Sequence, residues 1–234
     1  MKSFVAFIVM FIIIIIILVI FFHHFHIFEA FTPIVPNKPT FAAKTDRYNK
    51  PFILDNLIDK DLCQKIINQS VDKLVDSEII SGKHKSVRNS QQYWINKNDP
   101  MVKPLFEQIS SMFNIPFENA EHLQVVRYLP NQYYNEHHDS CCDDNKECAD
   151  FVQRGGQRVL TVLIYLNNEF TDGQTFFPKL DLKIKPPSGS AIVFYPLAMN
   201  SDKCHPHALH AGTPVTSGEK WIANLWYRQQ PFPE

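Results

Sequence analysis

The sequence has almost no net charge, and this absence limits what the protein can bind. Its 23 Lys and Arg residues nearly balance its 24 Asp and Glu residues, so the formal net charge is −1. No block of five or more Lys and Arg residues occurs either. Because nucleic-acid binding needs a positive surface field, we expect no nucleic-acid partner.

The chain also lacks an internal repeat and contains little glycine. There are 7 glycines in 234 residues, and six of them fall between Gly155 and Gly218. A chain of this length without repeats can form one well-buried domain and an appendage. Glycine is needed where the backbone turns sharply, so its distribution predicts many turns in the second half of the chain.

One long stretch near the start has neither charges nor strongly polar side chains. Residues 4–22 read FVAFIVMFIIIIIILVIFF, which as a helix is long enough to span the hydrocarbon layer of a membrane. The residues that follow offer no small-residue pattern for signal cleavage. We therefore predict an uncleaved signal anchor over residues 1–30, with a cleaved signal peptide as the alternative.

The charges beside this stretch predict its orientation. Lys2 precedes it, and no Lys or Arg follows until Lys38. This bias keeps the N-terminus in the cytoplasm. We expect a single-pass protein of the endoplasmic reticulum or another secretory-pathway membrane, with its main part in the lumen. Signal cleavage would instead give a secreted protein.

Such a compartment is oxidising and permits disulfides, and the chain has cysteines that could form them. Two disulfides and one free thiol are possible. The pairing cannot be deduced from the spacing. Asn68 begins an Asn-Gln-Ser triplet that matches the N-glycosylation signal, although it falls in a predicted helix. The five cysteines are Cys63, Cys141, Cys142, Cys148 and Cys204.

The rest of the chain divides into a stalk and a folded domain. Residues 31–49 contain three prolines and no periodic apolar pattern, which indicates an extended stalk. We expect one domain over residues 50–234. It begins with two segments, 59–78 and 98–114, in which apolar residues recur at helical spacing. Pro100 fits the first turn of the second helix.

From His122 onward the chain is organised as short runs rich in β-branched and aromatic residues. Glycines separate several of these runs. Helices followed by a series of short strands predict a mainly β protein. We expect a double-stranded β-helix (jelly-roll) core with the N-terminal helices packed on one sheet. The predicted strands are 122–129, 157–166, 182–186, 190–196 and 220–228.

The stretch NEHHDSCCDD, residues 135–144, concentrates side chains that bind metals. In a strand, side chains two residues apart share a face, so His137 and Asp139 would point one way and His138 the other. One more histidine would complete the two-His, one-carboxylate set that holds non-haem Fe(II). The candidates for this histidine are His205, His207 and His210. We favour His210, because it begins a strand-like stretch.

Ten residues beyond His210, Lys220 begins the apolar strand 220–228. A lysine that points into a barrel is costly unless an anion pairs with it, and a dicarboxylate cosubstrate would supply that anion. H-x-D pairs occur by chance, and single lysines usually lie on the surface. The ordered set of H-x-D, distal histidine and lysine is much more specific.

The segments around these residues resemble the prolyl 4-hydroxylase group of Fe(II)- and 2-oxoglutarate-dependent dioxygenases. LQVVRYLPNQYYNEHHD resembles the family's approach to its H-x-D pair, and GGQRVLTVLIYLN resembles its next strand. DGQTFFP is similar to its GGETxFP turn, and ALHAGTPVTSGEKWIANLW resembles its distal segment. FILDNLIDKDLCQKII resembles its first helical segment. The resemblance covers roughly residues 50–229.

The resemblance implies a role for individual residues. His137, Asp139 and His210 would bind Fe(II), and Lys220 would pair with the far carboxylate of 2-oxoglutarate. Further residues implied for the cosubstrate pocket are Tyr128, Tyr165, Thr161 and Trp226. For the three aromatic residues among them, ordinary packing in the core is nearly as good an explanation.

The implied reaction is hydroxylation of proline residues in peptides or proteins, of the procollagen-proline type. It is coupled to oxidative decarboxylation of 2-oxoglutarate to succinate and CO₂, uses O₂, and depends on L-ascorbate to keep the iron reduced. Two alternatives stay open. One is a sister dioxygenase that acts on another residue or a non-peptide substrate, and the other is a non-catalytic binding module on the same fold. The oligomeric state is also open.

Two features depart from the family pattern. His138 stands where the family often has an aromatic residue, and we expect its side chain to face away from the metal. The loop 140–156 carries three cysteines and several acidic side chains. We favour a disulfide between Cys148 and either Cys141 or Cys142. Because this loop lies near the expected substrate mouth, it bears on the substrate more than on the chemistry.

Overall fold

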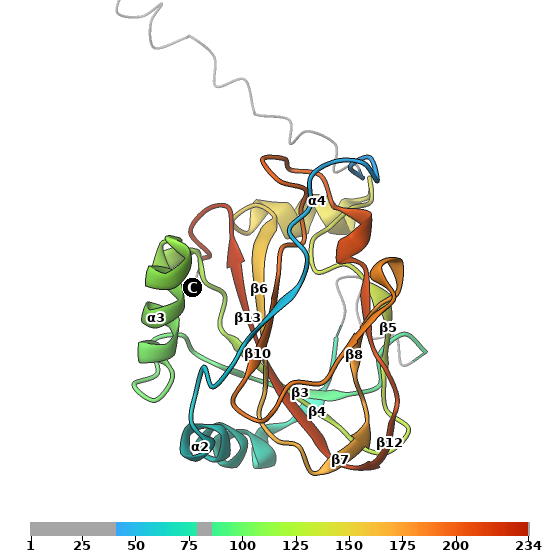
Figure 1. Cartoon of the computed structure of the whole chain (residues 1–234). Helices are drawn as coiled ribbons and strands as arrows, with labels where there is room; N and C mark the ends of the chain where they lie inside the picture. Colours follow the sequence, from blue (N-terminus) through green and yellow to red (C-terminus); the bar gives the residue numbers. More distant parts are fainter. Residues whose placement is uncertain (1–40, 79–85, 234) are drawn as a thin grey trace, which may run out of the picture. The chain divides into compact units, whose positions relative to one another are not determined.

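The computed structural model describes residues 41–78 and 86–233 (Figure 1). The chain divides into two units, Met1–Asn37 and Lys38–Glu234, and the fold described below is that of the second. The predicted anchor over residues 1–30 lies outside the described ranges. Within those ranges, no helix combines the length and the apolar character needed to cross a membrane.

A seven-stranded antiparallel sheet forms the framework of the folded unit. Its strand order is β1-β10-β6-β13-β4-β3-β2. The central strand β13 is buried along its whole length and pairs with both β4 and β6. The bounds are β1 Phe52–Leu54, β2 Val75–Asp76, β3 Gln91–Ile95, β4 Leu123–Tyr128, β6 Arg158–Tyr165, β10 Ala191–Phe194 and β13 Lys220–Arg228.

A second, smaller set of strands lies against this sheet. Four strands form a sheet in the order β5-β11-β8-β9, and β12 pairs with β7. All five strands that the sequence predicts are present, and the mainly β fold with its jelly-roll core is confirmed. The bounds are β5 Tyr134–His137, β7 Phe170–Asp172, β8 Thr175–Phe177, β9 Leu182–Ile184, β11 His210–Gly212 and β12 Val215–Gly218.

Alternate side chains of the large sheet face two different apolar cores. Val125 of β4 and Val162 of β6 belong to the core beneath the helices. Their neighbours Val126 and Leu163 belong to the core shared with the smaller sheet. This alternation is the period of two that a β-strand imposes. It turns every second residue of β4, β6 and β13 toward the interior between the two sheets.

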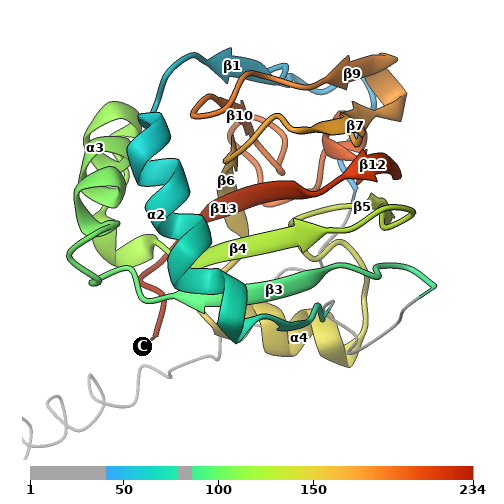
Figure 2. The same cartoon turned by 90° about the horizontal axis from the view of Figure 1, so that it is seen from below.

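Two helices, α2 (Lys60–Ser70) and α3 (Lys103–Phe113), cover the outer face of the large sheet (Figure 2). The side chain of Asp59 caps α2 by accepting a hydrogen bond from the backbone N–H of Leu62, 2.7 Å away. Ile66 of α2 and Phe106 of α3 are fully buried against the sheet. The predicted packing of the helices on one sheet is therefore confirmed.

The first helix is shorter than the predicted segment 59–78. After Ser70 the chain forms a 3₁₀ turn at Val71–Lys73 and then enters strand β2. The Ser70 hydroxyl donates to the Ile66 carbonyl at 2.8 Å, a bond that competes with the helical ladder. Pairing of β2 with β3 then takes Val75 out of the helical stripe to which its spacing assigned it.

The second helix also begins later than predicted. Pro104, and not Pro100, occupies its first turn, because the helix starts at Lys103. Pro100 precedes it, in a turn closed by the hydrogen bond from the Val102 N–H to the Asp99 carbonyl. The C-terminal end agrees with the prediction, since Asn114 ends the helix in a left-handed conformation with φ of 52°.

The last part of the predicted stalk (31–49) belongs to the folded unit. Ala42 is buried, and its backbone N–H donates to the Cys204 carbonyl at 2.9 Å. The ring of Tyr48 stacks on that of His205 with 4.4 Å between the centroids. The chain therefore reaches the domain before residue 50 and packs along the segment that precedes His210.

Two disulfides connect the loop that follows strand β5. Cys141 bridges Cys148, which is one of the two pairings expected for Cys148. Cys142 bridges Cys204, a pairing that the sequence left open. Cys63 is the free, buried thiol among the described cysteines. The loop also contains helix α4 (Lys146–Gln153), which was not predicted from the sequence.

The burial of α3 gives a direct test of the fold. Phe106→Ala removes a side chain with no exposed surface and should cost about 3–5 kcal/mol of the free energy of unfolding. Met112→Ala lies on the same helix but at a position that is 48% exposed, and should change stability by less than about 0.5 kcal/mol. Urea unfolding of both variants measures the difference. Equal losses would contradict the packing described here.

Candidate metal and cosubstrate site

Pairing of strands β5 and β11 places two of the predicted ligands side by side. His137 ends β5, His210 begins β11, and the two are direct partners in the antiparallel register. Asp139 lies two residues beyond the end of β5, although the sequence suggested one continuous strand through it. Ligand atoms of the three residues nevertheless lie within 4.8 Å of one another.

The orientation of both imidazoles is fixed by backbone carbonyls. His137 Nδ1 lies 2.7 Å from the Asn135 carbonyl, and His210 Nδ1 lies 2.9 Å from the Ala208 carbonyl. A carbonyl oxygen can only accept, so each Nδ1 carries the proton and each Nε2 has a free lone pair. Both Nε2 atoms lie 3.8 Å from Oδ1 of Asp139. The three donor atoms therefore face one point.

The Asp139 carboxylate is held by its other oxygen. Oδ2 accepts hydrogen bonds from Thr161 Oγ1 at 2.7 Å and from Trp226 Nε1 at 3.0 Å. Burial alone would raise the pKa of Asp139. Interactions with His210, His137 and Arg158, together with the hydrogen bond from Thr161, outweigh burial and lower this pKa to about 2. The carboxylate is ionised, with Oδ1 left for a metal.

Burial favours the neutral form of the His137 imidazole. Burial, followed by repulsion from His210, holds the pKa of His137 well below its usual value. The ring of Tyr134 stacks on the His137 ring with 3.5 Å between centroids, which excludes water from one face. A neutral imidazole is the form that binds metals. The cluster thus presents two imidazole nitrogens aimed at one point and one anionic oxygen donor.

These donors fit the two-His, one-carboxylate arrangement of non-haem Fe(II), which leaves coordination positions open. Among the described residues, no other group of three His, Cys, Asp or Glu side chains could hold a metal. His205 and His207 are not part of it. His138 is not a ligand either, and its ring packs against Phe41 with 5.2 Å between centroids.

Lys220 is buried near this cluster without a charged partner. Only 2% of the residue is exposed, and no carboxylate of the described residues acts on the pKa of its ammonium group. Burial, with a smaller contribution from Lys185, lowers its pKa to about 7. Its Nζ lies 5.1 Å from the ring centre of Tyr128 and 5.0 Å from that of Tyr165. A buried, unpaired lysine fits a site for an anion.

A single narrow cavity connects Lys220 with the metal cluster. Tyr128 and Trp226 line it, as the sequence indicated. Tyr165 does not line it, but its hydroxyl bonds with Oγ1 of Thr175 at 2.9 Å, and Thr175 lines the cavity. Thr161, expected in the cosubstrate pocket, donates a hydrogen bond to Asp139, which lines the cavity. The sequence reasoning missed Thr175 and Asn224, which both line this cavity.

A larger cleft of about 620 Å³ lies beside this cavity, and Asp139 and Trp226 line both. The Arg158 guanidinium lies 3.5 Å from the ring centre of Trp226. Arg158 and Arg228 both donate to the buried carboxylate of Glu121, at 2.6 and 2.8 Å. The sequence analysis did not single out Glu121, Arg158 or Arg228. The one feature of the sequence that points to them is that each charged residue lies at or near the end of an apolar strand.

The hydrogen bond to Asp139 predicts a test of the metal site. Thr161→Val removes one donor to the carboxylate without changing side-chain size, and should weaken Fe(II) binding about 10- to 100-fold. Thr171→Val removes an exposed hydroxyl that bonds Ser217 and serves as the matched control. Anaerobic calorimetric titration with Fe(II) compares them. Unchanged affinity of the Thr161 variant would contradict the role given to this bond.

Comparison with known proteins assigns the part of the chain that carries these residues to a protein family. Residues 123–228 match the family model of the 2OG-Fe(II) oxygenase superfamily. A provisionally named prolyl 4-hydroxylase of Acanthamoeba polyphaga mimivirus is 66% identical over 193 residues, which cover 82% of this chain and 80% of that protein. Prolyl 4-hydroxylase 1 of Arabidopsis thaliana is 32% identical over 68% of this chain and 60% of its own length.

A solved structure extends the similarity to the backbone. The crystal structure of a viral collagen prolyl hydroxylase from Paramecium Bursaria Chlorella virus-1, in complex with 2-oxoglutarate, superimposes with a TM-score of 0.60. It is 32% identical, and the match covers 76% of this chain and 95% of that one. The similarity therefore spans nearly all of that enzyme.

Proposed function

The chain belongs to the prolyl 4-hydroxylase family of Fe(II)- and 2-oxoglutarate-dependent oxygenases, and we propose a reaction for it on that basis. It hydroxylates proline residues in peptides or proteins and converts 2-oxoglutarate and O₂ to succinate and CO₂. The observation that carries the proposal is the convergence of His137, Asp139, His210 and Lys220 on one buried cavity.

In the proposed metal centre, Fe(II) is held by His137 Nε2, Asp139 Oδ1 and His210 Nε2. When bound, the iron would activate O₂, the oxidant of the reaction, with two electrons supplied by the oxidative decarboxylation of 2-oxoglutarate and two by the hydroxylated C–H bond. The protein's contribution is orientation: two backbone carbonyls fix the imidazoles, and Thr161 and Trp226 fix the carboxylate. L-Ascorbate, which is typical of the family, keeps the iron reduced.

Lys220 binds the far carboxylate of 2-oxoglutarate in this proposal. The cosubstrate carries two negative charges, and the buried ammonium would gain the counter-ion that it otherwise lacks. Tyr128 and Thr175 complete the walls around it. Burial strengthens the ion pair, because solvent does not screen it. The other end of 2-oxoglutarate would face His137, Asp139 and His210, which line the same cavity.

The proline-containing peptide occupies the larger cleft. Asp139 and Trp226 belong to the walls of both cavities, so a side chain that enters from the cleft arrives beside the metal cluster. The Arg158 guanidinium lies over one face of the Trp226 ring, so this wall of the cleft is both aromatic and cationic.

We also propose a location for the enzyme in a secretory-pathway membrane, most simply the endoplasmic reticulum, with residues 31–234 in the lumen. Two features support it: the apolar run at residues 4–22 and the presence of two disulfides, which persist in oxidising compartments. Protease treatment of intact microsomes should leave the lumenal part undigested. Digestion would contradict the orientation, and loss of the N-terminal segment would favour secretion.

The reaction is tested with the purified full chain in detergent. With Fe(II), ascorbate and 2-oxoglutarate, a proline-rich peptide should gain 16 Da on proline, with about one succinate formed per oxidation. His210→Ala should lose the reaction and keep its thermal unfolding profile. Oxidation at another residue would support a sister dioxygenase. Absence of succinate from an iron-loaded protein would support a binding module.

Replacement of Lys220 separates its roles in function and stability. Lys220→Met should raise the KM for 2-oxoglutarate about 100-fold, since it removes a buried charge partner. It should also stabilise the fold by roughly 2 kcal/mol at pH 6, because the folded protein no longer buries an unpaired charge. Lys179→Met, at an exposed position, is the control for both measurements.

The stability gain should depend on pH in a defined direction. The pKa of Lys220 falls from its ordinary 10.5 in the unfolded chain to about 7 in the folded protein. The penalty for burying its charge is therefore complete below pH 7 and fades as the pH rises toward 10.5. Chemical unfolding should show a larger gain for Lys220→Met at pH 6 than at pH 10. A larger gain at pH 10 would refute the burial argument.

A further inference from the structure

We propose that the Cys141–Cys148 disulfide is a positioning element for peptide binding. It holds helix α4 in place as one wall of the large cleft, while the metal and cosubstrate site is held by other contacts. The inference deepens the proposed function and rests on it, because the peptide is assigned to that cleft. It predicts that loss of this one disulfide impairs peptide binding and spares 2-oxoglutarate binding.

Helix α4 has too little apolar surface to fix its own position. Of its eight residues, only Cys148 and Phe151 are buried. They form a small apolar cluster with Cys141, apart from the two main cores. A helix of two turns is not stable alone, and its position depends on tertiary contacts. One of its two buried contacts is the disulfide itself.

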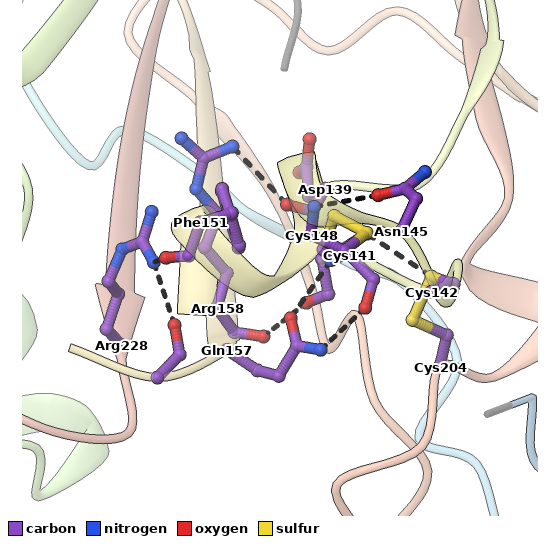
Figure 3. The surroundings of a disulfide bond; sticks show 12 residues. Asp139, Cys141, Cys142, Asn145, Cys148, Phe151, Gln157, Arg158, Cys204 and Arg228 are labelled. Carbon is purple, nitrogen blue, oxygen red and sulfur yellow. Dashed lines mark hydrogen bonds between the residues drawn. A yellow bond between two sulfur atoms is a disulfide. The ribbon is translucent and has the colours of Figure 1, made fainter. Parts of the chain in front are cut away.

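The disulfide ties α4 to a part of the chain that is itself rigid (Figure 3). The Gln157 side chain accepts from the Cys141 N–H at 2.9 Å and donates to the Cys141 carbonyl at 2.6 Å. The Ser140 hydroxyl donates to the Arg158 carbonyl at 2.7 Å. These hydrogen bonds fix Cys141 beside the start of strand β6. Because the disulfide joins Cys141 to Cys148, it also fixes the beginning of α4 there.

The other end of α4 is held by arginines of the cleft. The Phe151 carbonyl accepts from Arg228 at 2.8 Å, and the Phe151 ring lies 4.0 Å from the Arg228 guanidinium and 5.3 Å from that of Arg158. Arg158 in turn contacts Trp226 and Glu121 in the cleft. A displacement of α4 would therefore move the side chains that line the cleft.

The helix contributes directly to the cleft and not to the cosubstrate cavity. Glu147, Asp150, Phe151 and Arg154 line the space of about 620 Å³. Trp94 of strand β3 lines the same cleft. No residue of α4 lines the cavity around Lys220. Helix α4 thus forms part of the wall of the peptide cleft and no part of the wall of the cosubstrate cavity.

The second disulfide has a different place in the fold. Cys142–Cys204 joins the segment after Asp139 to the segment before His210, and so connects the two ligand-bearing parts of the chain. Its removal should disturb the metal site as well as the cleft. The effect expected for Cys141–Cys148 is therefore specific to one of two disulfides that begin at neighbouring residues.

The test compares three forms of the full chain: wild type, Cys141→Ala/Cys148→Ala, and Cys63→Ala as the control for loss of a buried thiol. The double variant should show about a tenfold higher KM for a proline-rich peptide, because a displaced wall no longer orients it. Binding of 2-oxoglutarate to the Mn(II)-loaded protein, followed by calorimetry, should stay within about twofold of wild type. The control should match wild type in both.

Limited trypsin digestion measures the position of α4 without reference to activity. Lys146 begins the helix and Arg154 follows its end, and both side chains are exposed. Cleavage after these two residues should be faster in the double variant than in wild type, and cleavage after residues of the helices α2 and α3 should be unchanged. A variant that fails to fold would instead be cut faster everywhere, and its 2-oxoglutarate binding would be lost.

Each outcome has a distinct meaning. Unchanged peptide KM with unchanged cleavage overturns the inference, and so does an equal loss of peptide and 2-oxoglutarate binding, whether from misfolding or not. If wild type oxidises no peptide, the proposed function fails. Faster local cleavage with intact 2-oxoglutarate binding would in that case still support the positioning of α4 by this disulfide.

Discussion

The site depends on the buried carboxylate of Asp139, whose two oxygens have different partners. Oδ2 of Asp139 is bound by Thr161 of strand β6 and Trp226 of strand β13, and Oδ1 is left facing the imidazoles. This requires the centre of the large sheet to pack against the strand pair that carries His137 and His210. The jelly-roll core is what brings these elements to one point, and its apolar interior keeps the donors dry.

Two of the buried charged residues in the described part of this fold differ in their pairing: Glu121 is paired, and Lys220 is unpaired. Glu121 is neutralised by Arg158 and Arg228, so that a charged trio is tolerated beneath the cleft. Lys220 is left without a counter-ion among the described residues, and its pKa is lowered accordingly. An unpaired charge lowers the stability of the protein, and a bound dicarboxylate would restore it. A loss of stability confined to one buried residue is typical of a ligand-binding site.

The sequence was most informative where a regular spacing carries chemistry. The four residues expected at the metal and cosubstrate site lie around one cavity, and β13 has the bounds predicted from its apolar run. The contact between Thr161 and Asp139 could not be read from the sequence, because it depends on the register between β6 and β13. Helix α4 was missed since its position comes from one disulfide and two arginines, contacts that leave no periodic apolar pattern.

The central claim is that one cavity holds both the iron and 2-oxoglutarate. Anomalous diffraction from crystals grown without oxygen, with Fe(II) and 2-oxoglutarate, tests it most directly. The account predicts an iron peak between His137 Nε2, Asp139 Oδ1 and His210 Nε2, with a carboxylate of 2-oxoglutarate at Lys220 Nζ. An iron peak at other residues, or a cosubstrate whose carboxylates both lie away from Lys220, would contradict it.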